Sequence, residues 1–161
     1  MIKLLILDVD GTLTDGSVYI SENGEVFKKF NIKDGLGITL ILPKIGIDPI
    51  VITGRESEAT AVRCEEIGIS DIYQGVANKS DTLKIICDEK NISLKDVAYI
   101  GDDINDFDCM VEIKKAGGIV ACPKDAIRDV RHISDYVSTK TGGKGAVRDF
   151  IEYLANIKAR G

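Results

Sequence analysis

The chain has 161 residues, the length of one domain, and 44% of them are hydrophobic and 29% charged, a balance that excludes a disordered protein. Its net charge of -5 argues against a broad nucleic-acid-binding face, and no apolar run approaches the roughly 18 residues of a membrane span. Its four cysteines form no Cys-x-x-Cys pair, which argues against a zinc site or a disulfide framework. We therefore expect one domain over residues 1–161, in the reducing cytoplasm, with neither nucleic acid nor membrane as a partner.

Short apolar runs alternate with amphipathic stretches along the chain. The apolar runs predict buried strands at residues 3–9, 49–53, 97–101 and 118–121, with shorter ones at 72–73 and 136–137. The amphipathic stretches predict helices at residues 34–44, 56–67, 79–90, 103–115 and 146–157. This alternation predicts an α/β fold in which helices cover both faces of a doubly wound parallel sheet.

One segment interrupts the alternation. Residues 17–21 and 25–30 flank the sequence Glu22-Asn23-Gly24, and Asn-Gly is a strong hairpin signal. With Asn23 and Gly24 as the turn, Ile20 would lie opposite Phe27. Large apolar groups would then occupy both faces of the hairpin, so we expect another surface to cover it.

Polar residues follow four of the expected elements, at the edge of the sheet where doubly wound folds bind ligands. The first strand runs into Asp8-Val9-Asp10-Gly11-Thr12, and the second into Thr53-Gly54-Arg55. Lys79 begins a helix, and Gly101-Asp102-Asp103 follows a later strand, with Asp106 one helical turn beyond. The carboxylates would repel one another without a cation, and their oxygens suit Mg²⁺. Lys79, Thr53 and backbone N–H groups near Gly54 suit a phosphate.

These four segments resemble the motifs of the haloacid dehalogenase superfamily of phosphatases, and the resemblance covers most of the chain. It implies that Asp8 attacks phosphorus and that Asp10 is the general acid and base. It also implies that Mg²⁺ is held by Asp8, the backbone carbonyl of Asp10, and Asp102. Thr53 and Lys79 match the phosphate-binding positions. An Asp rather than a Thr at position 10 favours hydrolysis, because it can protonate the leaving oxygen and then activate water.

Asp103 and Asp106 are expected to support this site from behind. The stretches from Asp10 to Thr53 and from Thr53 to Lys79 are already used by the hairpin, two helices and a strand. Neither has room for the cap domain that many superfamily members carry. We therefore expect a haloacid dehalogenase core with a hairpin insertion and no cap, whose site is open unless a neighbouring subunit closes it.

A closer resemblance is to the 3-deoxy-D-manno-octulosonate 8-phosphate phosphatases. It rests on Asp15-Gly16, Asn23-Gly24-Glu25, Phe30-Asn31-x-Lys33-Asp34-Gly35, Tyr73-Gln74-Gly75, Asn78-Lys79 and Gly142-Gly143-x-Gly145-Ala146-Val147-Arg148. It implies Mg²⁺-dependent hydrolysis of that sugar acid phosphate to the free sugar acid and phosphate, in lipopolysaccharide sugar biosynthesis. It also implies a homotetramer built around the hairpin, with the glycine-rich segment reaching a neighbour's active site. Lys33 departs from the family pattern, where Arg is common.

Arginines are the candidates for substrate choice, because a sugar acid carries a carboxylate far from its phosphate. Arg55, beside Gly54, is the first candidate, and Arg63 and Arg148 are further ones; these last two are as well explained as surface helix charges. Three alternatives remain open. The substrate could be a nine-carbon sialic-type sugar acid 9-phosphate, the chain could be a phospho-aspartate receiver-like signalling domain, or it could be a non-catalytic oligomerisation module.

Overall fold

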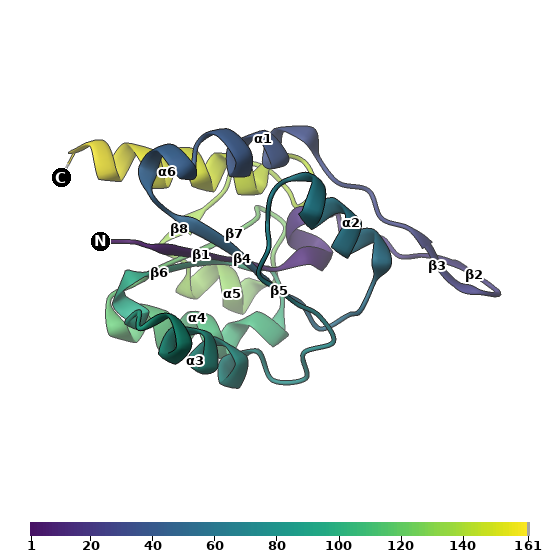
Figure 1. Cartoon of the computed structure of the whole chain (residues 1–161), viewed down its shortest axis with the longest axis horizontal. Helices are drawn as coiled ribbons and strands as arrows, with labels where there is room; N and C mark the ends of the chain where they lie inside the picture. The colour runs from purple at the N-terminus through teal and green to yellow at the C-terminus, as the bar shows by residue number, and fades with distance from the viewer. Residues whose placement is uncertain (161) are drawn as a thin grey trace.

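The computed structural model describes residues 1–160, the side chain of Val26 excepted. Its main sheet contains six strands: β1 (Leu4–Leu7), β4 (Asp48–Ile52), β5 (Ile72–Tyr73), β6 (Val97–Ile100), β7 (Ile119–Cys122) and β8 (Tyr136–Val137). They lie in the order β5-β4-β1-β6-β7-β8, and every neighbouring pair is parallel (Figure 1). From β1 the chain builds the sheet outward first on one side and then on the other. The order therefore reverses beside β1, and doubly wound folds bind ligands at such a crevice.

The helices form two layers, one on each face of the sheet (Figure 1). One layer holds α1 (Ile32–Leu40), α2 (Glu58–Glu66) and α6 (Ala146–Arg160), and the other holds α3 (Lys79–Lys90), α4 (Ile104–Ala116) and α5 (Arg128–Ile133). Strand β1 is buried on both faces: Leu5 and Leu7 pack in the first core, Leu4 and Ile6 in the second. The expected doubly wound α/β fold is confirmed.

Local capping explains where two helices begin. The Asn78 side chain accepts hydrogen bonds from the backbone N–H groups of Ser80 and Asp81, so α3 starts at Lys79 as expected. Asp103 and Asp106 form a capping box at the start of α4. Helix α1 starts two residues earlier than expected, because Asn31 rather than Asp34 is its cap. Helix α5 was not expected, since its six residues are too few to show a helical period.

The hairpin consists of β2 (Tyr19–Ser21) and β3 (Gly24–Phe27), and it projects away from the two layers (Figure 1). Its register differs from the expectation: Ser21 pairs with Gly24 and Tyr19 with Phe27, so Ile20 does not lie opposite Phe27. The Ser21 hydroxyl accepts a hydrogen bond from Asn23 N–H and donates one to Gly24 O. This places the turn at Glu22 and Asn23, and the Tyr19 and Phe27 rings stack with centroids 4.3 Å apart.

The stretch from β1 to β4 holds a wide turn, the hairpin and α1, and the stretch from β4 to α3 holds α2 and β5. Within residues 1–160 no cap domain is inserted between the motifs, as the spacing predicts. None of the helices over the same residues is both long and apolar enough to cross a membrane.

The glycine-rich segment before α6 packs on its own chain. Gly143 N–H donates to the Thr12 carbonyl at 3.1 Å. A Cβ added to Gly142 would lie 1.9 Å from the Gly11 carbonyl oxygen, so only glycine allows this approach. Gly142 and Gly143 are therefore wedged behind the turn that follows β1, and the reach of this segment to a neighbour's active site stays a prediction.

Candidate active site

The turn after β1 presents two of the expected acidic residues. Asp8 is 2% exposed, and its N–H donates to the Ile100 carbonyl of β6 at 3.1 Å, which fixes it at the crevice. Residues Val9–Leu13 then form the turn, with Gly11 at φ 94°. A Cβ on Gly11 would lie 2.1 Å from Asp102 Oδ2, so this glycine lets the turn and the loop after β6 meet.

A buried lysine bridges two of the carboxylates. Lys79 Nζ donates to Asp8 Oδ1 at 2.6 Å and to Asp106 Oδ1 at 2.7 Å. Asp106 also accepts the Tyr99 hydroxyl at 2.7 Å on the same oxygen, and the backbone N–H groups of Asp102 and Asp103 on the other. Asp106, expected only to support the site, therefore holds Lys79 in place and shapes the loop after β6.

Burial makes the charged forms of the residues in this cluster less favourable. Burial and the neighbouring charge of Asp106 raise the pKa of Asp8 well above its usual range, and the same two causes raise the pKa of Asp102 to about 6. Burial by itself would lower the pKa of Lys79, but the charges of Asp8 and Asp106 raise it above its ordinary value. The site thus holds more negative charge than its one lysine neutralises, and a cation would relieve it.

The carboxylates fit a small divalent cation. Asp8, Asp102 and Asp106 each offer one oxygen, and these oxygens lie within 4.8 Å of one another. Because both Asp106 oxygens already accept hydrogen bonds, Asp8 and Asp102 are the better candidates to hold the ion. The carboxylate of Asp10, the remaining expected ligand, lies outside this group and pairs with Lys28. Its backbone carbonyl as a ligand stays a prediction.

A pocket of about 230 Å³ opens beside the cluster. Its lining brings together six of the residues expected from the sequence, Asp8, Asp10, Thr53, Gly54, Arg55 and Asp103, with two that were not expected, Ile104 and Asn105. The position of the last two, directly after the Asp102-Asp103 pair, is the signal that could have found them. Thr53 is buried at the end of β4. The segments after β1, β4 and β6 therefore converge at this pocket, and the start of α3 brings Lys79 to Asp8 beside it, as the parallel sheet predicts.

The other two candidate arginines lie outside this pocket lining. Arg63 donates to the Asn31 carbonyl at 3.3 Å, pairs with Glu66 at 2.7 Å, and stacks near the Phe30 ring. Arg148 pairs with Glu152 at 2.6 Å, and it lines a separate groove with Lys33, Lys140 and Lys144. Within one chain Arg63 joins α2 to the start of α1, and Arg148 forms an ion pair along α6; a role for either at the substrate stays a prediction.

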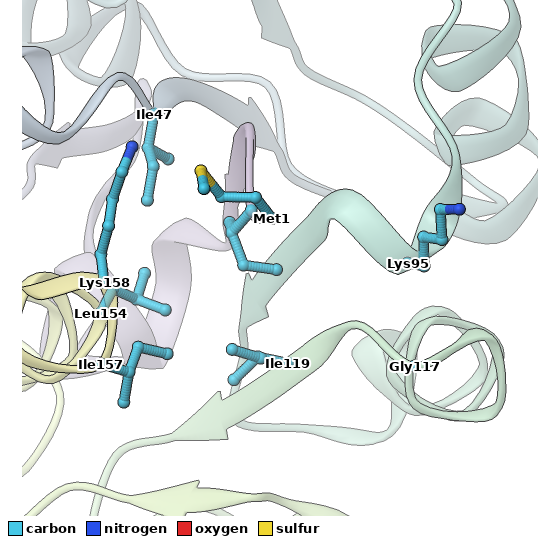
Figure 2. A pocket seen from close by; sticks show the side chains of 9 residues that line it. Met1, Ile47, Lys95, Gly117, Ile119, Leu154, Ile157 and Lys158 are labelled. Carbon is cyan, nitrogen blue, oxygen red and sulfur yellow. The ribbon is translucent and has the colours of Figure 1, made fainter. Parts of the chain in front are cut away.

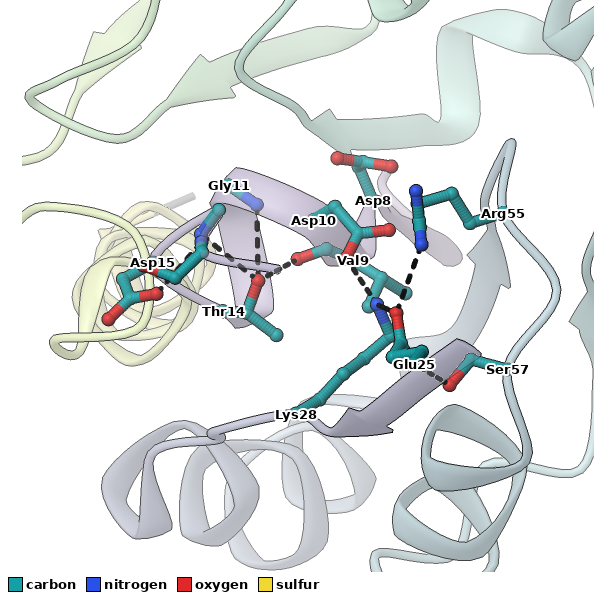
Figure 3. A network of polar contacts seen from close by, with 12 residues as sticks. Asp8, Val9, Asp10, Gly11, Thr14, Asp15, Glu25, Lys28, Arg55 and Ser57 are labelled. Carbon is teal, nitrogen blue, oxygen red and sulfur yellow. Dashed lines mark hydrogen bonds and ion pairs between the residues drawn. The ribbon is translucent and has the colours of Figure 1, made fainter. Parts of the chain in front are cut away.

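The hairpin base also reaches the site, which the sequence did not indicate (Figure 3). Lys28 Nζ lies 2.5 Å from Asp10 Oδ1 and 3.0 Å from Glu25 Oε2. Glu25 in turn accepts from Arg55 at 3.2 Å and from the Ser57 hydroxyl at 2.5 Å. The hairpin is therefore tied both to the turn after β1 and to the loop after β4.

Comparisons with known proteins give this arrangement a family. Residues 52–151 match the model of the haloacid dehalogenase-like hydrolases. The 3-deoxy-D-manno-octulosonate 8-phosphate phosphatase KdsC of Escherichia coli K12 is 39% identical over 153 residues, 95% of this chain and 79% of that protein. The corresponding phosphatase of Yersinia pestis is 35% identical over the same shares.

Solved structures agree with the sequence matches. A phosphatase of the same name from Moraxella catarrhalis, in complex with magnesium, phosphate and KDO, superposes with a TM-score of 0.88 at 40% identity, covering 98% of this chain and 87% of that one. The cobalt-bound enzyme of Haemophilus influenzae superposes with a TM-score of 0.90 at 33% identity, covering 98% and 90%. The chain belongs to the haloacid dehalogenase-like hydrolases and, within them, to the 3-deoxy-D-manno-octulosonate 8-phosphate phosphatase family.

Proposed function

We propose that the protein is a Mg²⁺-dependent phosphatase that hydrolyses 3-deoxy-D-manno-octulosonate 8-phosphate to the free sugar acid and phosphate. One observation carries the proposal: Lys79 bridges Asp8 and Asp106 at the crevice beside β1, with Asp102 alongside and Thr53 in the adjoining pocket. Family membership supplies the substrate, since the similar proteins carry this activity in their names.

The positions of the side chains support the following reaction. An oxygen of Asp8 attacks phosphorus, the ester P–O bond breaks, and Asp10 gives its proton to the leaving sugar oxygen. Water then attacks the phosphorus of the aspartyl phosphate, its proton passes to Asp10, and the bond to Asp8 breaks to release phosphate. Lys79 holds one Asp8 oxygen at 2.6 Å, which leaves the other for attack.

Magnesium held by Asp8 and Asp102 would neutralise phosphate charge and orient the phosphoryl group for in-line attack. Thr53, at the end of β4, and the backbone beside Gly54 line the same pocket and are our candidates for binding phosphate oxygens. Arg55 lies further out, with a half-exposed side chain, where it would bind the remote carboxylate of the sugar acid.

A phosphate-release screen tests the proposal. The protein with Mg²⁺ is offered eight-carbon and nine-carbon sugar acid phosphates and simple alkyl phosphates. We expect the highest kcat/KM on the eight-carbon substrate and no activity after chelation of the metal. Preference for a nine-carbon substrate would replace the substrate and keep the chemistry, whereas no phosphate release from any ester would contradict the proposal.

We also propose that the enzyme is a cytoplasmic homotetramer. Four cysteines, Cys64, Cys87, Cys109 and Cys122, are buried and free, which suits a reducing compartment. Apolar side chains on the hairpin are exposed, with Ile20 at 64% and Phe27 at 50%, and a second copy would cover them. Light scattering should give four times the chain mass, and Phe27→Asp should split the assembly; a wild-type monomer with full activity would contradict this.

A further inference from the structure

Lys28 is a buried cation between two carboxylates at the mouth of the site (Figure 3). Its side chain is 2% exposed, and Nζ contacts Asp10 Oδ1 at 2.5 Å and Glu25 Oε2 at 3.0 Å. A buried ammonium group is costly unless it is paired, and Lys28 has two anionic partners. Over residues 1–160, it is the one cation that forms an ion pair with Asp10.

The second partner fixes Lys28 from behind. Glu25 accepts from the Ser57 hydroxyl at 2.5 Å and from Arg55 at 3.2 Å, and Ser57 is the residue before α2. Lys28 is thus anchored to the loop after β4 as well as to its own strand. An ammonium group held between two carboxylates has little freedom to move, so it can hold the carboxylate of Asp10 in one orientation.

The contact occupies only one oxygen of Asp10. With Oδ1 held by Lys28, the carboxyl group cannot rotate freely, and Oδ2 is left for proton exchange. Asp10 lines the same pocket as Asp8 and Thr53, where we expect the phosphate to bind. The Oδ2 atom of Asp10 therefore belongs to a carboxyl group that borders the expected phosphate site. Proton transfer needs a donor within hydrogen-bond reach of the leaving oxygen, and a freely rotating carboxyl group would meet that condition less often.

We propose that Lys28 is a positioning residue for the reaction: it holds Oδ1 of Asp10 so that Oδ2 serves the leaving oxygen and then the attacking water. The proposal rests on the proposed function through the role of Asp10. It makes the hairpin part of the chemistry as well as a surface for association. Lys28 itself touches neither phosphorus nor the reacting oxygens.

The test compares two esters in rapid-quench experiments that measure the formation of the aspartyl phosphate. The sugar acid phosphate has a poor leaving group that needs a proton, whereas 4-nitrophenyl phosphate has a good leaving group that needs little help. For Lys28→Met we expect aspartyl-phosphate formation from the sugar substrate to slow by about 10–100-fold, part of the 10²–10⁴-fold typical of general acid catalysis. The burst with the aryl ester should change far less, while its later steady state slows because water activation also uses Asp10.

Lys29→Met is the matched control, because Lys29 is adjacent, half exposed, and only 3.8 Å from its nearest carboxylate, Asp15. It should change neither ester. Lys28→Gln, which keeps one hydrogen-bond donor, should show the same ester-selective loss in weaker form, and it replaces Lys28→Met if that variant does not fold by circular dichroism.

Equal losses on both esters in the first step would overturn the proposal, because they would indicate general damage to the site. A sugar-ester rate equal to that of Lys29→Met would overturn it as well. The proposed function fails separately: if the wild-type protein cleaves alkyl phosphates other than sugar acid phosphates, the substrate is wrong, and Lys28→Met is compared on the alkyl ester that is cleaved. A wild-type protein inactive on every ester overturns both proposals.

Discussion

The two ends of the parallel sheet carry cavities of opposite character. At the amino ends of the strands a cavity of about 310 Å³ is lined mainly by apolar side chains, including Ile47, Ile119, Leu154 and Ile157, with the lysines Lys95 and Lys158 among them (Figure 2). At the carboxyl ends the pocket is smaller, about 230 Å³, and Asp8, Asp10 and Asp103 are among its lining residues.

The apolar cavity at the amino ends, although it is the larger of the two, holds none of the expected catalytic residues and is not the candidate active site. What distinguishes the carboxyl end is charge that burial makes costly: Asp8, Lys79 and Asp106 are all nearly inaccessible to solvent. The remaining sheet and its two apolar cores must hold these groups in place. We expect substitutions at the carboxyl end to change activity and those at the amino end to change stability.

The largest effect on activity is expected for Asp8→Asn. An amide cannot attack phosphorus or serve as an anionic metal ligand, so turnover should fall by several orders of magnitude. Thermal unfolding should show that the fold survives, since the substitution removes a carboxylate whose charge is strained by burial. More than about one per cent of wild-type turnover would contradict the role of Asp8 as nucleophile.

The counterpart at the amino end is Leu154→Ala. Leu154 is 1% exposed and lines the apolar cavity, so its truncation enlarges a space that is already present. The free energy of unfolding should fall by about 2–5 kcal/mol in denaturant titrations. The kcat of the folded protein should be unchanged, and a large loss of kcat would mean that the two ends are coupled.

Arg55→Ala distinguishes recognition of the sugar acid from binding of the phosphate at the carboxyl end of the sheet. Arg55 pairs with Glu25 at 3.2 Å, and a substrate carboxylate would compete for the same guanidinium. Because a hydrogen bond to a charged group contributes about 1.5–3 kcal/mol, kcat/KM on the sugar acid phosphate should fall by roughly 10–150-fold. Hydrolysis of 4-nitrophenyl phosphate should change little. Equal losses on both esters would assign Arg55 to the phosphate instead.

The smallest effect is expected for Asp34, a buried acid away from both cavities. Burial raises its pKa to about 6, opposed by the N–H groups of Arg148 and Gly145 and by the charge of Arg63. The folded protein therefore binds this proton more tightly than the unfolded chain does. The stabilisation of the folded state by this tighter proton binding is fully present below about pH 4, and it is lost as the pH rises through about 6.

Asp34→Asn tests that sign. Relative to the wild type, the stability of the variant should rise by at most about 3 kcal/mol between pH 4 and 6 and then level off. Urea titrations across this range measure the difference. A difference that is constant with pH would show that Asp34 has an ordinary pKa.

The sequence was sufficient to predict the site residues whose positions are determined by the end of a strand. Asp8, Thr53 and Asp102 each follow a short apolar run, and parallel strands bring such ends to one edge, so their meeting followed from the pattern. Asn78 and Asp103 were also predictable, because a cap acts within a few residues of its helix.

Contacts that depend on how distant segments fold back were not predictable in the same way. Lys28 reads as one of two adjacent lysines after an apolar strand, and only the path of the hairpin shows that it turns toward Asp10 while Lys29 faces solvent. The wedging of Gly142 against Gly11 likewise depends on the position of α6. The hairpin register was mispredicted because the Ser21 side chain, not the Asn-Gly pair, sets the turn.

The most direct test of the account is to detect the aspartyl phosphate. Asp10→Asn should be mixed with Mg²⁺ and 4-nitrophenyl phosphate, whose leaving group needs little help from a proton, and quenched in acid, and its peptides analysed by mass spectrometry. Without the base that activates water, the intermediate should accumulate, and the phosphoryl group should be found on Asp8 alone. A phosphoryl group on another residue, or none on an Asp10→Asn protein that still releases phosphate, would contradict the assignment of Asp8 at the carboxyl end of β1 as the nucleophile.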